Sequence, residues 1–209
     1  MIEGRGPKYK AWIRAATIWI AVTSAIVVPI AAAALSPLLA WRDPIYVAGG
    51  LAGVIAMTLL LVQPMLAGGY LPGLPNQIYR RTHRVVGGLL VGMVMLHVLA
   101  LWITSPPDVI DALFFRSPTP FSLWGVVAMW AVFASALLAA LRRRLHLRPI
   151  AWRLAHKTLA VVIVLGTVVH ALLIQGTMET VSKVALCLLI LAATAKVLID
   201  LRRQRRRVP

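Results

Sequence analysis

The sequence predicts an all-α integral membrane protein, a six-helix bundle with cytoplasmic termini. Three observations lead to this fold class. The chain of 209 residues is 60% hydrophobic and only 13% charged, so it lacks the polar surface that a soluble domain of this size needs. Its apolar residues form long continuous runs, and its basic residues gather in alternate loops. Both patterns are typical of helical membrane proteins.

Six segments are apolar over about the 20 residues that a helix needs to cross a bilayer. They cover approximately residues 11–35, 45–68, 84–104, 121–141, 155–175 and 180–200. None of them alternates between apolar and polar residues, which argues against a β-barrel. We therefore expect one transmembrane domain over residues 1–209, with no separate soluble domain.

The connections between the spans contain residues that end helices. The first span is too long for a cleavable signal peptide. Pro and Gly in residues 67–81 separate the second span from the third. Residues 103–120 join the third span to the fourth, and residues 108–115 predict a short helix at the membrane surface. Trp residues near the span ends, Trp152 among them, are expected to anchor the bundle at its two interfaces.

The distribution of basic residues predicts the orientation. Of the 22 Lys and Arg, 19 lie in residues 5–14, 80–84, 142–157 and 196–207, whereas Arg42, Arg116 and Lys183 fall on the other side. This asymmetry places the termini in the cytoplasm and predicts a multi-pass protein of the inner (cytoplasmic) membrane. The net charge of +16 then favours contact with anionic lipid, and nucleic acid is not expected as a partner.

Two apolar segments each carry a pair of histidines fourteen residues apart: His83 and His97, then His156 and His170. Fourteen helical residues turn about 1400°, about 40° short of four full turns, and rise about 21 Å, so each pair shares a face at two depths. The third and fifth spans cross the membrane in the same direction. His83 is therefore expected level with His156, and His97 level with His170, as axial ligands of two stacked haems.

The residues around the histidines are compatible with haem. Small residues beside a porphyrin would leave it room; the candidates are Gly87, Gly88, Gly92 and Gly166. Haem propionates near the cytoplasmic face would need cations, and the candidates are Arg80, Arg81 and Arg84. These arginines equally suit a purely topogenic role, and the glycines equally suit helix packing. Intramembrane histidines can also bond neighbouring helices or relay protons, as in a proton-coupled transporter.

Two motifs resemble those of a known family. "HRVVG" at residues 83–87 with His97, and "RLAHK" at residues 153–157 with His170, are similar to the third-helix and fifth-helix motifs of the ferric reductase-like transmembrane domain family. Its relatives include NADPH oxidases, metalloreductases and the haem subunit of the bacterial methionine sulfoxide reductase system. The resemblance implies two haem b groups, bound by these four histidines, that pass electrons from the cytoplasmic side outward.

The sequence contains no glycine fingerprint for a dinucleotide, so we expect an oxidoreductase component without catalytic residues of its own. A cytoplasmic flavin reductase or a membrane quinol, contributing flavin or quinone, would be the electron donor. A ferric complex or a periplasmic reductase, such as methionine sulfoxide reductase, would be the acceptor. A cytochrome b of the quinol complexes, a proton-coupled transporter and a structural subunit are the alternatives.

Overall fold

The computed structural model describes residues 7–206, and this part of the chain is helical with no strand. The helices are α1 (Pro7–Ala34), α2 (Pro44–Gly68), α3 (Asn76–Thr104), α4 (Pro106–Leu113), α5 (Pro120–Leu141), α6 (Pro149–Leu173) and α7 (Thr180–Arg206), with a short 3-10 helix at Pro37–Leu39. Arg5 and Arg207, two of the basic residues that predict the orientation, lie outside the described residues.

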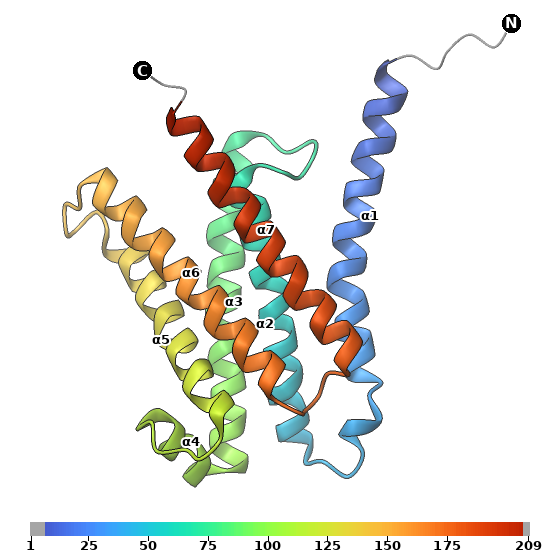
Figure 1. Cartoon of the computed structure of the whole chain (residues 1–209), viewed down its shortest axis with the longest axis vertical. Helices are drawn as coiled ribbons and strands as arrows, with labels where there is room; N and C mark the ends of the chain where they lie inside the picture. Colours follow the sequence, from blue (N-terminus) through green and yellow to red (C-terminus); the bar gives the residue numbers. More distant parts are fainter. Residues whose placement is uncertain (1–6, 207–209) are drawn as a thin grey trace, which may run out of the picture.

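All of these helices except α4 are long and apolar enough to cross a membrane. The predicted fold class, a bundle of six membrane-spanning helices, is therefore confirmed. The first turn of α1 and the last turn of α7 lie at the same end of the bundle (Figure 1), which we call the terminal end. α4 lies at the opposite end, where the sequence predicts a short surface helix. Which side of the membrane the terminal end faces stays a prediction.

Three helices extend beyond the predicted spans by six residues or more. α3 begins at Asn76 rather than residue 84, α6 begins at Pro149 rather than residue 155, and α7 continues to Arg206. Hydropathy detects only the apolar part of a helix, whereas a helix continues through basic turns until a specific residue ends it. Pro75 is the N-cap of α3, and Pro149 occupies the first turn of α6, where a proline suits a helix start. His83 thus lies within α3, not in a loop before it.

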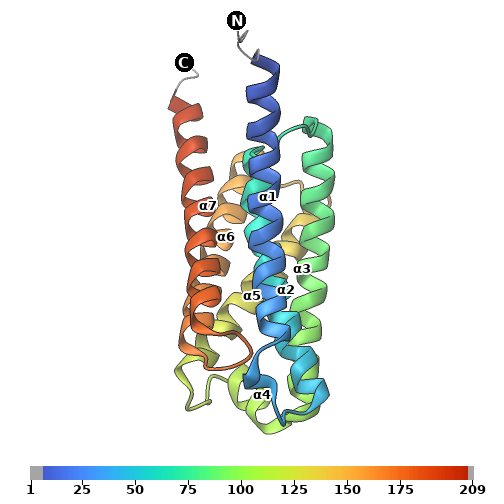
Figure 2. The same ribbon diagram turned by 90° about the vertical axis from the view of Figure 1, so that its right-hand side faces the viewer.

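The bundle is built on two antiparallel helix hairpins. α2 packs along α3, and α5 packs along α6, while α7 lies against both α2 and α6 (Figures 1 and 2). α1 covers the outside of α2 and α7. Because α3 and α6 each start at the terminal end, they run in parallel, as the sequence predicts. The largest fully buried side chains, Leu186, Ile190, Thr58 and Cys187, come from α7 and α2.

Candidate functional site

The four histidines of α3 and α6 face one another in two pairs. The ring centres of His83 and His156 are 6.2 Å apart, and those of His97 and His170 are 6.5 Å apart. We call His83 and His156 the proximal pair, because they lie nearer the terminal end, and His97 and His170 the distal pair. The structure therefore brings together the partners that the depth argument predicts.

Both separations match two imidazoles on opposite sides of one metal ion. A metal–imidazole bond is about 2 Å long and each ligating nitrogen lies about 1 Å from its ring centre, so the two ring centres fall about 6 Å apart. The ring planes are inclined by 75° in the proximal pair and 79° in the distal pair. Direct stacking would bring the rings closer, so each pair has the spacing of two axial ligands.

Backbone carbonyls hold the distal imidazoles. His97 Nδ1 lies 2.8 Å from the carbonyl oxygen of Gly49 in α2, and His170 Nδ1 lies 2.8 Å from the carbonyl oxygen of Phe121 in α5. A carbonyl only accepts hydrogen bonds, so each Nδ1 carries the proton and donates it. The lone pair of each ring is then on Nε2, which is the arrangement of metal-binding histidines in proteins.

A glycine one turn after each acceptor lets the ring lie against the helix. A Cβ at Gly53 would be 3.1 Å from His97 Nδ1, and a Cβ at Gly125 would be 2.7 Å from His170 Nδ1. The two hairpins share one arrangement. A backbone carbonyl at position i accepts a hydrogen bond from an imidazole of the next helix, and a glycine at position i+4 leaves room for that ring. Neither glycine is predicted from the sequence, because Gly53 and Gly125 lie on α2 and α5 rather than beside the histidines in the chain.

Side chains surround the proximal pair instead. His156 Nδ1 is 3.0 Å from the hydroxyl of Ser135, and its ring stacks on Trp152 at 5.0 Å between centres and 19° between planes. Trp152 is predicted as an interface anchor, but it also packs directly on a candidate ligand. His83 Nδ1 and Gln63 Oε1 are both buried without a partner, while Gln63 Nε2 donates to the backbone carbonyl of His83 at 3.3 Å.

A cavity of about 450 Å³ contains the distal pair, within the range of cofactor pockets. Its middle is apolar, and its end opposite the termini is polar. The middle is lined by Met57, Leu60, Leu90, Met129, Val132 and Ile163, and the polar end by Ser105, Asp108, Thr119, Ser122 and Lys183. α3 and α6 make few close backbone contacts with each other. The free Nε2 atoms, the ring spacing and the amphipathic lining fit a haem held edge-on between these helices.

The structure places the other predicted arginines and glycines in different surroundings. Arg80, Arg81 and Arg84 lie in the first turns of α3 with exposed side chains, and a propionate contact stays a prediction for them. Gly166 packs closely on Ala128 and Trp124 of α5, so it serves helix packing. A Cβ at Gly88 or Gly92 would meet nothing within 4 Å, whereas one at Gly87 would lie 3.2 Å from Gln63 Nε2.

Each pair offers two protein ligands and no more. Among the described residues, no group of three or more His, Cys, Asp and Glu side chains comes together to hold an ion. A pair of imidazoles suits an iron whose remaining four ligands are the nitrogens of a porphyrin.

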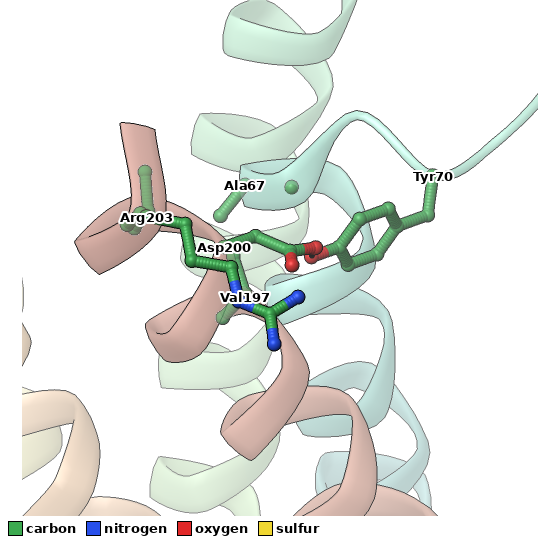
Figure 3. A pocket seen from close by; sticks show the side chains of 7 residues that line it. Ala67, Tyr70, Val197, Asp200 and Arg203 are labelled. Carbon is green, nitrogen blue, oxygen red and sulfur yellow. Dashed lines mark hydrogen bonds between the residues drawn. The ribbon is translucent and has the colours of Figure 1, made fainter. Parts of the chain in front are cut away.

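A second cavity, of about 360 Å³, lies between the terminal ends of α2 and α7. There the Tyr70 hydroxyl points at the carboxylate of Asp200 (Figure 3) and donates to it at 2.7 Å. Partial burial, together with this bond to Asp200, raises the pKa of Tyr70 to about 12. Lys196 pairs with the same carboxylate at 2.8 Å. These contacts tie the end of α2 to α7.

The fold and the site define a class: a multi-pass helical membrane protein with two imidazole pairs stacked along two parallel helices. The chain belongs to the family described as ferric reductase like transmembrane component, which it matches over residues 48–167, more than half of its length. The matched segment contains His83, His97 and His156, and it ends just before His170.

Neither a search of curated proteins nor a search of solved structures gave a match. The family assignment therefore rests on the matched segment, and it agrees with the resemblance seen in the sequence. Members of this family typically bind haem, and the family indicates electron transfer across a membrane.

Proposed function

We propose that this protein is a transmembrane di-haem b electron carrier, in which His83 and His156 bind one haem and His97 and His170 bind the other. One observation carries the proposal. Two pairs of imidazoles stand at the spacing of axial ligands, 6.2 and 6.5 Å between ring centres, at levels that lie about 21 Å apart along the helices. Bound haem would supply one-electron chemistry that amino acid side chains do not provide.

The residues of this chain would bind the haems, orient the axial ligands and keep water away from the distal haem. Gly49 and Phe121 accept the Nδ1 protons of the distal ligands, which leaves the lone pair of each ring on Nε2, available to bind iron. The apolar residues in the middle of the cavity exclude water from its interior. Exclusion of water and a fixed ligand orientation would together set the reduction potential of the distal haem and protect it from changes caused by solvent.

The direction of transfer follows from the charge asymmetry. With the basic terminal end in the cytoplasm, the proximal haem would receive electrons from a separate flavin reductase or from a membrane quinol. The distal haem would deliver them on the outer side to a ferric complex or a periplasmic reductase. The methionine sulfoxide reductase system is one candidate for the latter. The polar, hydroxyl-rich end of the distal cavity favours an acceptor that approaches from water.

The test is the haem content and spectrum of the purified protein. Expression with ample haem should give about two b haems per chain, with the low-spin spectrum of bis-histidine ligation. His146→Asn is the matched control, because His146 lies outside α5 and α6 with φ of 47° and Asn tolerates that conformation. A folded, colourless protein would contradict the proposal and favour a proton-coupled transporter, the class that also places histidines within a membrane.

A further inference from the structure

Lys183 is a buried cation in the cavity of the distal pair. It is the fourth residue of α7, its side chain is only 7% exposed, and it lines the same cavity as His97 and His170. Every other Lys or Arg whose burial the structure describes is at least partly exposed. The sequence analysis counts Lys183 only as one of three cations on the outer side, so its burial is a finding of the structure.

No carboxylate neutralises this cation directly. Lys183 Nζ donates to the carbonyl oxygen of Ile174 at 2.8 Å, and Lys183 makes no ion pair within 4.0 Å with any carboxylate of the described side chains. Glu179, one turn earlier, interacts with Lys183 electrostatically but makes no ion pair with it within 4.0 Å. Its carboxylate is exposed and accepts from the backbone amides of Ser182 and Val181, which are the main reason that the pKa of Glu179 is held below its usual range.

The buried ammonium of Lys183 has one hydrogen-bond partner, a neutral carbonyl, and no anionic one. Buried charges in proteins are normally paired, and an ammonium has three protons to donate, of which one is used here. The first turn of α7 adds its own positive potential at the same place. Asp108 also lines this end of the cavity; its carboxylate accepts from the hydroxyl of Ser105 and makes no ion pair with Lys183. The cavity therefore presents a cation without a direct ion-pair partner beside an apolar interior.

We propose that Lys183 binds a carboxylate that enters this cavity, and that the carboxylate is a propionate of the haem held by His97 and His170. This inference rests on the proposed function. Haem is an apolar macrocycle with two carboxylates on one edge, and the cavity has the matching division: apolar side chains around its middle, and Lys183 with several hydroxyls at the end opposite the termini. Lys183 would fix which edge of the haem faces outward.

The contact has an electrical consequence. Reduction of a haem iron adds one negative charge, and a nearby cation stabilises the reduced state. Low dielectric around the cavity makes the effect larger than at the surface. Lys183 should therefore raise the midpoint potential of the distal haem and leave that of the proximal haem unchanged, because about 21 Å separates the two levels.

The experiment is a redox titration of the full chain loaded with haem, in which the distal signal is the one that His97→Leu removes. Lys183→Met should lower the distal midpoint potential by an amount that corresponds to about tenfold or more in the reduction equilibrium, whereas Lys183→Arg should change it little. Lys196→Met is the matched control, since it removes an exposed lysine from the same helix about 20 Å away. Equal distal potentials in wild type and Lys183→Met would overturn the inference.

A second arm identifies the source of the carboxylate. In protein loaded with haem dimethyl ester, whose propionates are blocked, the wild-type chain should retain less distal haem than with unmodified haem, whereas Lys183→Met should retain about equal amounts of the two, because the contact that esterification removes is already absent. Equal retention of the two haems by the wild-type chain would overturn the propionate assignment. This arm needs only wild-type protein for its first result, so it still decides the matter if Lys183→Met does not fold. A shift in the distal potential that survives esterification and depends on added citrate would identify a soluble anion and overturn the propionate assignment.

Different results contradict the proposed function and the role of Lys183. A wild-type chain that binds no haem contradicts the proposed function before any lysine variant is made. A wild-type chain that binds two haems, with a distal potential indifferent to Lys183→Met and a distal haem content indifferent to esterification, leaves the proposed function intact and refutes the role of Lys183.

Discussion

The distal and proximal histidine pairs have nearly the same spacing but different supports. In the distal pair, both Nδ1 atoms donate to backbone carbonyls, those of Gly49 and Phe121, at 2.8 Å. In the proximal pair, His156 bonds a hydroxyl and stacks on an indole, while His83 Nδ1 is buried without a partner. One site is oriented by main chain, and the other by side chains.

The difference determines which kind of mutation can change each haem site. A backbone carbonyl remains whatever residue carries it, so the distal ligands depend on how closely α2 packs on α3 and α5 on α6. Side-chain partners of the proximal ligands can be exchanged without disturbing the helices. We therefore expect the distal site to respond to changes in packing and the proximal site to respond to changes in hydrogen bonding.

The largest effect should come from removing a ligand. His97→Leu and His170→Leu should give matching spectra that lack the distal haem, and His83→Leu and His156→Leu should match each other and lack the proximal haem. Haem content should fall from about two per chain to about one, because each six-coordinate iron needs both of its axial ligands. The measurement is a haem-to-protein ratio with a redox titration for each variant.

The double variants sharpen this result. His97→Leu with His170→Leu should cost little more than either change alone, since residues that share a site are not additive. His83→Leu with His97→Leu should remove both haems. If His83→Leu and His170→Leu shared one spectrum, the assignment of ligands to two levels would be wrong.

The next largest effect should come from Gly125→Ala. Its Cβ would lie 2.7 Å from His170 Nδ1 and 2.9 Å from Cε1, and the bond to the Phe121 carbonyl prevents the ring from moving aside. We expect weakened distal haem binding, measured as haem retained during purification, with the proximal haem kept. Gly53→Ala, with 3.1 Å to His97 Nδ1, should have the same effect in weaker form.

Gly92→Ala is the matched control for these two variants. It makes the same chemical change in a transmembrane helix, but its Cβ would meet nothing within 4 Å. It also lies about 140° round α3 from His97. An alanine there should leave haem content unchanged. Loss of the distal haem from Gly92→Ala would show that a change in helix flexibility, not a clash with the His170 ring, explains the Gly125 result.

Sequence alone predicts the six spans, the parallel direction of α3 and α6 and the pairing of their histidines, because these follow from hydropathy and helical periodicity. It does not predict the backbone carbonyls and glycines of α2 and α5 against which the distal rings lie. Gly53 and Gly125 are ordinary glycines in apolar helices until the packing of α2 on α3, and of α5 on α6, places an imidazole against each. Long-range contacts of this kind leave no periodic signal in the chain.

The same limit explains the other misses. Trp152 and Lys183 each have a sufficient explanation in the sequence, as an interface anchor and as an outer-side charge. Only the tertiary structure shows that one stacks on His156 and that the other lines the distal cavity. For Gly166 the sequence leaves two roles open, room for a porphyrin and helix packing, and the structure shows it in the contact between α5 and α6.

A smaller effect is expected from Ser135→Ala at the proximal pair. The hydroxyl of Ser135 is 3.0 Å from His156 Nδ1, and a hydrogen bond of this kind is worth about 1 kcal/mol net. Trp152 still holds the ring by stacking, so the haem should stay bound. We expect a changed proximal midpoint potential with an unchanged distal one. A change in both potentials would show that the two sites are not supported independently.

The smallest effect, and the one that distinguishes the two kinds of support most directly, is expected at Gln63. Gln63 Oε1 and His83 Nδ1 are both unpartnered and buried, and the Gln63 amide already contacts the carbonyl of His83 at 3.3 Å. A small rotation of the amide would let Oε1 accept from Nδ1 and make the imidazole a stronger donor to iron, which lowers the potential. Gln63→Leu should therefore raise the proximal midpoint potential, and Gln63→Glu should lower it, because a carboxylate is the stronger acceptor. Opposite shifts at the proximal haem, with a fixed distal potential in the same titration, would confirm that a side chain tunes this site. Shifts of the same sign in both variants would mean that Gln63 only fills space beside Gly87.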